Sequence, residues 1–233
     1  MDISGSFANV GLLITRSVKG EPVPVCIATV IGKRTLLTAA HCLTRFGDEQ
    51  PTKNLSLWFL QNASVRDGLR RVIEVKSWSI PIEYVENGPN RKTDLYSRSS
   101  NDIAAVYVTS DVGEPAILHN GEPKIEALLS QSDRGGSIVN YRPHSSSNED
   151  RFVALSWERS VVDVQWDVDR ENEVLSITTN DRQCGAESGS PVFTRFRENN
   201  ILTGILVSGL SDCSLKIGPR IENHIAWLRS KIR

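Results

Sequence analysis

The sequence predicts an all-β protein that ends in one helix. Short runs rich in β-branched and other apolar residues recur along the chain, and Gly, Pro, Asn or Asp lie between them. Residues 221–233 instead carry apolar side chains at helical spacing. A chain of 233 residues can bury a sizeable core, either as one large β domain or as two small subdomains packed together.

The first half of the chain contains the first group of predicted strands. They cover residues 10–15, 26–31, 35–39, 55–60, 72–76 and 103–108. Turn residues at 19–22 and 31–34 predict hairpin connections. The polar stretch 86–100 is longer than most loops in compact domains, so we expect it to be functional or mobile.

A turn-rich segment, residues 111–123, separates the two halves. We therefore predict an N-terminal unit of residues 1–113 and a C-terminal unit of residues 114–233. Strands of the second unit are predicted at residues 137–141, 152–157, 161–164, 174–178, 191–194 and 202–207. Ile221, Ile225, Leu228 and Ile232 predict an amphipathic terminal helix that packs on this unit.

The charge balance argues against partners that are recognised by a long-range electric field. Lys and Arg total 27 and Asp and Glu total 28, a net charge of −1, so we expect neither nucleic acid nor an acidic membrane as partner. No membrane span and no signal peptide are visible, so the chain is either a mature form or cytosolic. The four histidines are scattered and Cys-x-x-Cys is absent, so we expect no metal and no other cofactor.

Three separate segments supply residues for nucleophilic catalysis. Ser188 lies in the stretch 184–191, whose small residues let the backbone bend and approach a ligand, although such a stretch on its own also suits a surface turn. His41 lies in the run Thr-Ala-Ala-His-Cys, and Asp102 lies in Asn-Asp-Ile-Ala. A serine hydroxyl is a poor nucleophile until a histidine removes its proton, and a carboxylate holds that histidine in the required tautomer.

In the order His41, Asp102, Ser188, with these flanking residues, nearly the whole chain resembles the trypsin/chymotrypsin-like serine protease family. The motif around Ser188 departs from the family's usual Gly-Asp-Ser-Gly-Gly-Pro at three positions. The resemblance implies two six-stranded antiparallel β-barrels packed together, with a C-terminal α-helix. The first barrel would carry His41 and Asp102, and the second Ser188. It also implies a monomeric endopeptidase that forms an acyl-enzyme on Ser188, with protein or peptide substrates and protein inhibitors.

The family's oxyanion hole corresponds to the backbone N–H groups of Ala186 and Ser188. Most relatives have glycine where Ala186 stands, and a Cβ there would strain the loop or crowd the hole. Glu187 replaces an aspartate that, in activated relatives, pairs with a newly cleaved amino terminus. No such terminus is visible here, and Arg182 is the nearest alternative cation in sequence. These departures keep open a second reading, a noncatalytic relative that uses the fold for binding.

By the same resemblance, Arg182 lies at the base of the primary substrate pocket and Lys216 near its second wall. The strand edge that pairs with the substrate backbone would be Val207, Ser208 and Gly209. A basic pocket would favour Glu or Asp before the scissile bond. If Arg182 instead turns inward to Glu187, small residues would be preferred.

The four cysteines allow three pairings that the sequence cannot separate. The resemblance implies bonds between Cys26 and Cys42 and between Cys184 and Cys213. Disulfides favour a secreted or periplasmic protein. Four free thiols would indicate the cytosol.

Overall fold

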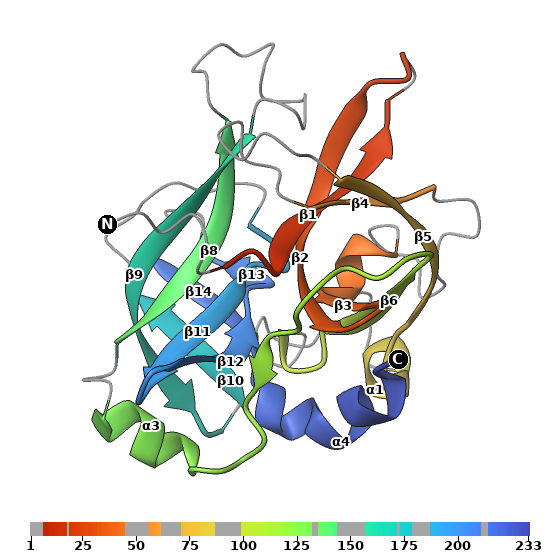
Figure 1. The fold of residues 1–233 in the computed structure, drawn as a ribbon. Helices are drawn as coiled ribbons and strands as arrows, with labels where there is room; N and C mark the ends of the chain where they lie inside the picture. Colours follow the sequence, from red (N-terminus) through yellow and green to blue (C-terminus); the bar gives the residue numbers. More distant parts are fainter. Residues whose placement is uncertain are drawn as a thin grey trace.

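The strands of the first half close into a six-stranded barrel in the computed structural model of the protein (Figure 1). The structure describes residues 7–17, 19–44, 56–61, 71–86, 99–131, 135–143, 157–171, 173–178, 187–210 and 214–233. The barrel strands are β1 (Val10–Arg16), β2 (Pro22–Gly32), β3 (Thr35–Thr38), β4 (Trp58–Gln61), β5 (Arg71–Ser79) and β6 (Ala104–Val108). They are antiparallel and close in the order β1-β2-β3-β6-β5-β4. Each of the six predicted runs overlaps one of these strands.

Apolar side chains from all six strands fill the interior of the barrel, and β5 contributes the fewest. Leu12, Leu37, Phe59 and Val106 have no exposed surface, and β3 and β6 are buried along their whole length. In β5 most residues are at least partly exposed, and Ile73 is its buried member. Burial of these apolar side chains is the main free-energy gain that holds the barrel together.

The second half forms an eight-stranded sheet in the order β13-β14-β10-β9-β8-β11-β12-β7. Its strands are β7 (Ile117–Leu118), β8 (Gly135–Pro143), β9 (Trp157–Asp169), β10 (Val174–Thr178), β11 (Pro191–Phe196), β12 (Asn199–Ile205), β13 (Ser208–Gly209) and β14 (Leu215–Pro219). Neighbouring strands are antiparallel except for β7 and β12, which are parallel. The all-β class with a C-terminal helix is thus confirmed. The second unit differs from the expected six strands by including the two-residue strands β7 and β13.

Two details of the second sheet differ from the prediction. The predicted run 161–164 is only the middle of the long strand β9. Val164 and Trp166 are buried while Asp163 and Gln165 are exposed, so the alternation of a strand continues past residue 164. The run 152–157 lies outside the described residues apart from Trp157, which begins β9. Strand β14 was not predicted, since a lysine, a glycine and a proline break its apolar pattern.

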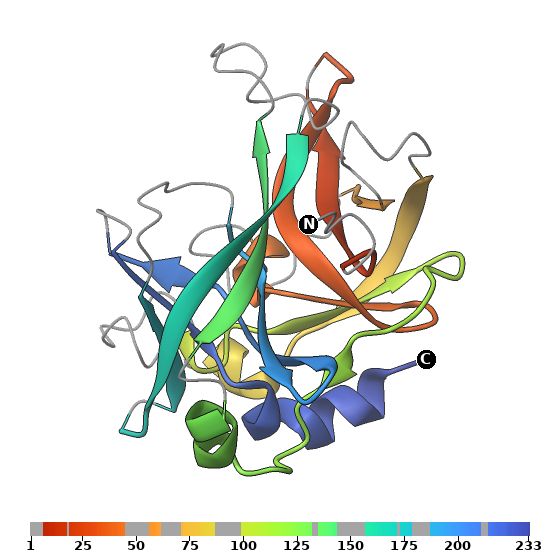
Figure 2. The same cartoon turned by 60° about the vertical axis from the view of Figure 1, so that its left-hand side comes forward.

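Helices occupy the periphery of the two sheets (Figures 1 and 2). Two short helices, α1 (Ile82–Glu86) and α3 (Ile125–Gln131), were not predicted. The predicted terminal helix is α4 (Ile221–Lys231), whose residues Ile221 and Leu228 are buried. No helix among the described residues is long and apolar enough to cross a bilayer.

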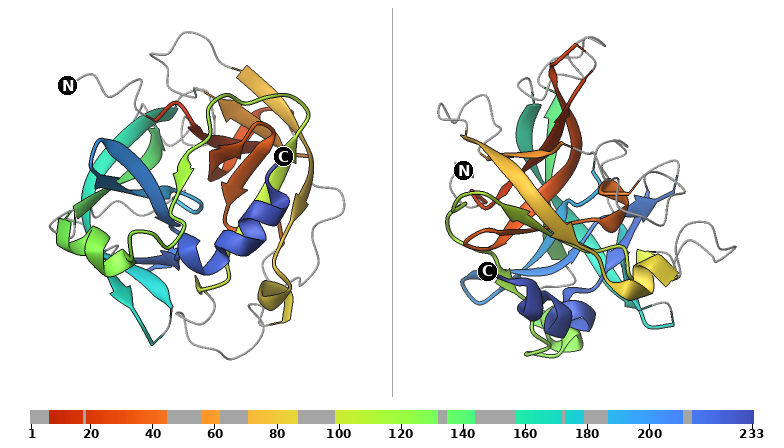
Figure 3. Two further views of the ribbon diagram at one scale, coloured as in Figure 1. Left: turned by 60° about the horizontal axis from the view of Figure 1, so that its bottom comes forward. Right: turned by 90° about the vertical axis from the view of Figure 1, so that its right-hand side faces the viewer.

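The larger of two hydrophobic core clusters spans the barrel and the second sheet, and the smaller one, which includes Trp166 and Leu175, lies within the second half. The larger cluster includes Val10 and Leu12 of the barrel together with Phe193 and Leu202 of the second sheet. A buried hydrogen bond also crosses the boundary, because the Tyr141 hydroxyl donates to the carbonyl of Val10 at 2.7 Å. Helix α4 lies beneath both sheets (Figure 3), and the chain just after it donates from the Arg233 N–H to Thr35 Oγ1 at 3.0 Å.

Candidate active site

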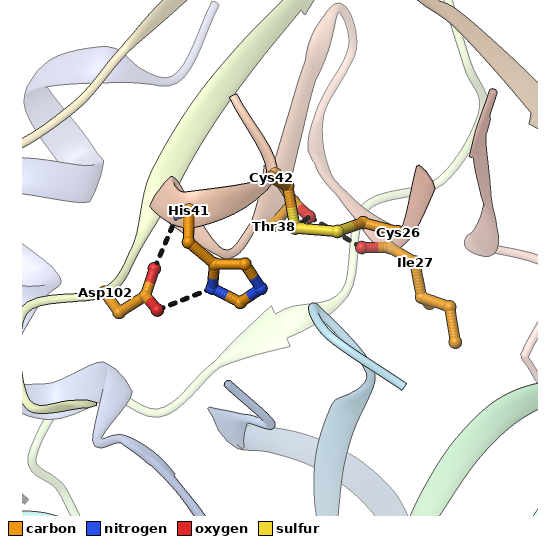
Figure 4. The surroundings of a disulfide bond; sticks show 6 residues. All are labelled: Cys26, Ile27, Thr38, His41, Cys42 and Asp102. Carbon is orange, nitrogen blue, oxygen red and sulfur yellow. Dashed lines mark hydrogen bonds and ion pairs between the residues drawn. A yellow bond between two sulfur atoms is a disulfide. The ribbon is translucent and has the colours of Figure 1, made fainter. Parts of the chain in front are cut away.

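His41 lies in a short 3-10 helix, Ala40–Cys42, that follows β3 of the barrel. The preceding residues Thr38, Ala39 and Ala40 have no exposed surface, so the chain entering this turn is fixed by packing. A disulfide between Cys26 and Cys42 ties the turn to β2, as expected for this pair (Figure 4). The imidazole keeps about a quarter of its surface in contact with solvent, with 23% of the side chain exposed.

Asp102 contacts His41 through both carboxylate oxygens. Oδ1 accepts the backbone N–H of His41 at 2.9 Å, and Oδ2 lies 2.6 Å from His41 Nδ1 (Figure 4). A carboxylate accepts hydrogen bonds, so Nδ1 carries a proton and the neutral ring has its lone pair on Nε2. Burial lowers the pKa of His41, but the charge and hydrogen bond of Asp102 outweigh burial and raise it above its ordinary value of 6.5.

The segment that carries Asp102 is fixed by groups that the sequence did not indicate. His224 of α4 lies with Nε2 2.7 Å from the carbonyl oxygen of Ser100, so Nε2 is the donor, and burial lowers the pKa of His224. Tyr84 of α1 is buried near Asp102. Its burial, and to a smaller extent the charge of Asp102, raises the pKa of Tyr84 to about 12. A hydrogen bond with Thr44 acts in the opposite direction. The terminal helix thus contributes to the position of the segment that carries Asp102, and Tyr84 of α1 lies close enough to interact with the charge of Asp102.

Ser188 lies in a turn, residues 187–190, that is hydrogen-bonded to both halves of the molecule. Its carbonyl accepts the N–H of Ile27 in β2 at 2.8 Å. The N–H of Gly189 donates to the carbonyl of Leu206 at 2.7 Å, and the N–H of Leu206 donates to the carbonyl of Ser190 at 2.8 Å. Gly189 has a φ of +84°, a conformation that favours glycine. A Cβ at this residue would overlap the Ile27 carbonyl oxygen.

The same strand, β2, links the Ser188 turn to His41. Ile27, which binds the carbonyl of Ser188, also accepts a hydrogen bond from Thr38 Oγ1 at 2.7 Å, and its neighbour Cys26 is bonded to Cys42. His41 directly precedes Cys42, and its ring nitrogen lies within 4.8 Å of both disulfide sulfurs. One connected set of contacts therefore joins the segments of His41, Asp102 and Ser188, which are far apart in sequence.

Glu187, the residue before Ser188, forms an ion pair with Lys216 of β14. Its other carboxylate oxygen accepts Asn140 Nδ2 at 2.7 Å. The family resemblance predicts Lys216 near the pocket wall, and Arg182 is the candidate cation for Glu187 that lies nearest in sequence. In the structure, Lys216 is the cation that pairs with Glu187. The signal that could have found it is a lysine inside the apolar strand β14, because a buried ammonium group requires a partner.

The remaining predicted residues are located as follows. Ser208 and Gly209 form β13, which pairs with β14 and is one of the two edge strands of the sheet in the described part of the chain. Val207 precedes them and donates its N–H to the carbonyl of Ile217 at 3.0 Å. Ala186, Arg182, Cys184, Cys213 and the stretch 87–98 lie outside the described residues.

The only cluster of metal-ligand types in the described residues is Cys26, His41 and Cys42. The two sulfur atoms are bonded to each other, so they cannot act as thiolate ligands. These contacts make available the chemistry of an oriented imidazole that is linked through β2 to a serine-bearing turn.

The family model described as Trypsin matches residues 4–228. A search of curated proteins found no significant match.

Proposed function

Because the chain belongs to the trypsin family, we propose that it is a serine endopeptidase that hydrolyses peptide bonds through an acyl-enzyme on Ser188. The observation that carries this proposal is the double contact of Asp102 with His41, at 2.9 Å to the backbone N–H and 2.6 Å to Nδ1. This contact leaves Nε2 as the basic nitrogen. Although burial lowers the pKa of His41, the charge and hydrogen bond of Asp102 raise it above 6.5, which strengthens Nε2 as a base.

In the proposed mechanism, Ser188 Oγ attacks the scissile carbonyl carbon while His41 Nε2 takes the hydroxyl proton. The carbonyl oxygen becomes an oxyanion that accepts from the backbone N–H groups of Ala186 and Ser188. When the C–N bond breaks, His41 returns the proton to the leaving amine, and the acyl group stays on Ser188. A water molecule then attacks the ester by the same route and releases the carboxylic acid. Asp102 stays ionised and stabilises the imidazolium that forms in each half.

The proposed recognition of substrate backbone uses the exposed edge strand β13. An extended peptide can add to such an edge through main-chain hydrogen bonds. For the residue before the scissile bond, the expectation of Glu or Asp now depends on Arg182, because the ammonium group of Lys216 is neutralised by Glu187. A peptide library tests this preference: efficient cleavage after Lys or Arg would contradict it, and cleavage after Ala or Val would favour an inward-turned Arg182.

We also propose that the protein works in an oxidising compartment, secreted or periplasmic. The Cys26–Cys42 bond supports this, since disulfides are rare in reducing compartments. Digestion of the natural protein without reduction should yield the linked Cys26–Cys42 and Cys184–Cys213 peptides, whereas free thiols in protein kept under oxidising conditions would count against it.

Labelling with a fluorophosphonate tests the proposed activity directly. The reagent should form an adduct on Ser188 of the wild-type protein and none on Ser188→Ala, which should also lose peptide hydrolysis while keeping its fold. Absence of the adduct would instead support the binding-protein alternative, which the substitutions at Ala186 and Glu187 suggest. Unchanged turnover in Ser188→Ala would exclude Ser188 as the nucleophile.

A further inference from the structure

Both oxygens of the Glu187 carboxylate are held by residues of the second sheet. Oε2 pairs with Lys216 Nζ, and Oε1 accepts Asn140 Nδ2 at 2.7 Å. The side chains of Lys216 and Glu187 are only 5% and 15% exposed. A charge this deeply buried is costly unless it is paired, so removing either partner leaves the other unfavourably placed.

The contacts extend from Glu187 to the other end of the turn. Asn140 Oδ1 accepts the hydroxyl of Ser190 at 2.5 Å, and the N–H of Ser190 donates to the carbonyl of Glu187 at 2.9 Å. Ser190 has no exposed surface. Ser188 is therefore flanked on both sides by residues bound to one buried polar network, in which Lys216 is the cation.

The anchoring residues come from regular strands, which hold them more rigidly than loops would. Asn140 lies on β8 and Lys216 on β14, and strands β9 and β10 separate β8 from β14 in the sheet. The curvature of the sheet thus directs side chains from two non-adjacent strands at one carboxylate. Rigid support of this kind fixes a reactive group within a fraction of an ångström.

We propose that Lys216 is a positioning residue: by pairing with Glu187, it holds the 187–190 turn so that Ser188 presents its hydroxyl and N–H in the reactive arrangement. The effect on catalysis rests on the proposed protease function, and the ordering of the turn does not. This role differs from that of a pocket wall, which would act on the choice of substrate. The two roles predict different outcomes for the same substitution.

The test compares wild-type protein with Lys216→Met, a substitution of similar length that removes the charge. We expect the rate of fluorophosphonate labelling at Ser188 to fall about 100-fold, the scale of a misplaced reacting group. Cleavage of a peptide library should fall by a similar factor for every residue before the scissile bond, with the ranking unchanged. Hydrogen exchange at the amides of Gly189 and Leu206 should accelerate, because their bonds hold the turn.

Two further variants separate positioning from general loss of stability. Glu187→Gln with Lys216→Met removes both charges, so it should fold and should react faster than Lys216→Met alone. Arg220→Met is the matched control: Arg220 is a partly buried cation paired with Glu222 at the start of α4. This control can lower the melting temperature but should leave the labelling rate of folded protein unchanged.

The proposal is overturned if Lys216→Met is labelled at the wild-type rate, whether or not its preferred residue before the scissile bond changes. It is also overturned if the double variant is no faster than Lys216→Met. A wild-type protein that takes no label would refute the protease function instead. In that case hydrogen exchange still decides, since unchanged protection of Gly189 and Leu206 in Lys216→Met would exclude the positioning role.

Discussion

Replacing Asp102 by asparagine tests the proposed roles of Asp102 and His41 with minimal change of shape. The asparagine carbonyl can still accept the His41 backbone N–H, which lies 2.9 Å from Oδ1. The amide NH₂ group would then face His41 Nδ1, where Oδ2 now lies at 2.6 Å. Because that group donates, the ring would carry its proton on Nε2 and would no longer be a base toward Ser188.

The expected loss follows from the two contacts that this variant changes. A hydrogen bond to a charged group contributes about 1.5–3 kcal/mol, and returning the ring to the reactive tautomer, with Nδ1–H facing the amide NH₂ group, costs about 1–3 kcal/mol. Together they predict a barrier higher by roughly 2.5–6 kcal/mol, or about 10²- to 10⁴-fold in kcat at 1.36 kcal/mol per tenfold. Labelling of Ser188 should slow by a comparable factor.

The matched control is Asp111→Asn, which makes the same chemical change at an exposed carboxylate bound to Arg34 Nε at 2.7 Å. It should leave kcat and the labelling rate unchanged. The assigned roles would be refuted by an Asp102→Asn protein that folds normally and keeps its kcat within about threefold of the wild-type value, a barrier change well below the expected one.

Further predictions concern pH, the disulfide and the serine turn. Because the pKa of His41 is raised, kcat/KM should fall as pH drops through a midpoint above 6.5, and a rate that stays flat to about pH 4 would indicate another base. Because the pKa of His41 is higher in the folded protein, protonation of His41 adds to the free energy of unfolding below pH 6.5. This contribution should be lost as pH rises through the raised pKa. Replacing Cys26 and Cys42 by alanine opens a loop of sequence separation 16 and should cost about 3 kcal/mol, lowering the melting temperature by roughly 6–12 °C in calorimetry; no change would contradict this. Gly189→Ala should destabilise by more than about 1 kcal/mol in urea unfolding, because φ is +84° and the added Cβ meets the Ile27 carbonyl and lies 2.6 Å from Thr38 Oγ1; an unchanged midpoint would refute the close approach.

Features that depend on local pattern could be predicted from the sequence. Short apolar and β-branched runs between turn residues located the barrel strands, such as β6, and helical spacing of apolar residues located α4. The motifs around His41 and Asp102 identified two residues that prove to be in contact although 61 positions separate them. These motifs could be recognised because the proposed proton transfer restricts the residue types at and beside His41 and Asp102.

Which side chains meet across the second sheet could not be predicted from the sequence. The pairing of Glu187 with Lys216 and Asn140 depends on the order of strands β8, β9, β10 and β14 and on the curvature that turns two of them toward one turn. His224 likewise reaches Ser100 only because α4 packs beneath the barrel. No spacing rule encodes such contacts, because a buried charge takes whichever partner the packed strands bring within reach, at any distance along the chain.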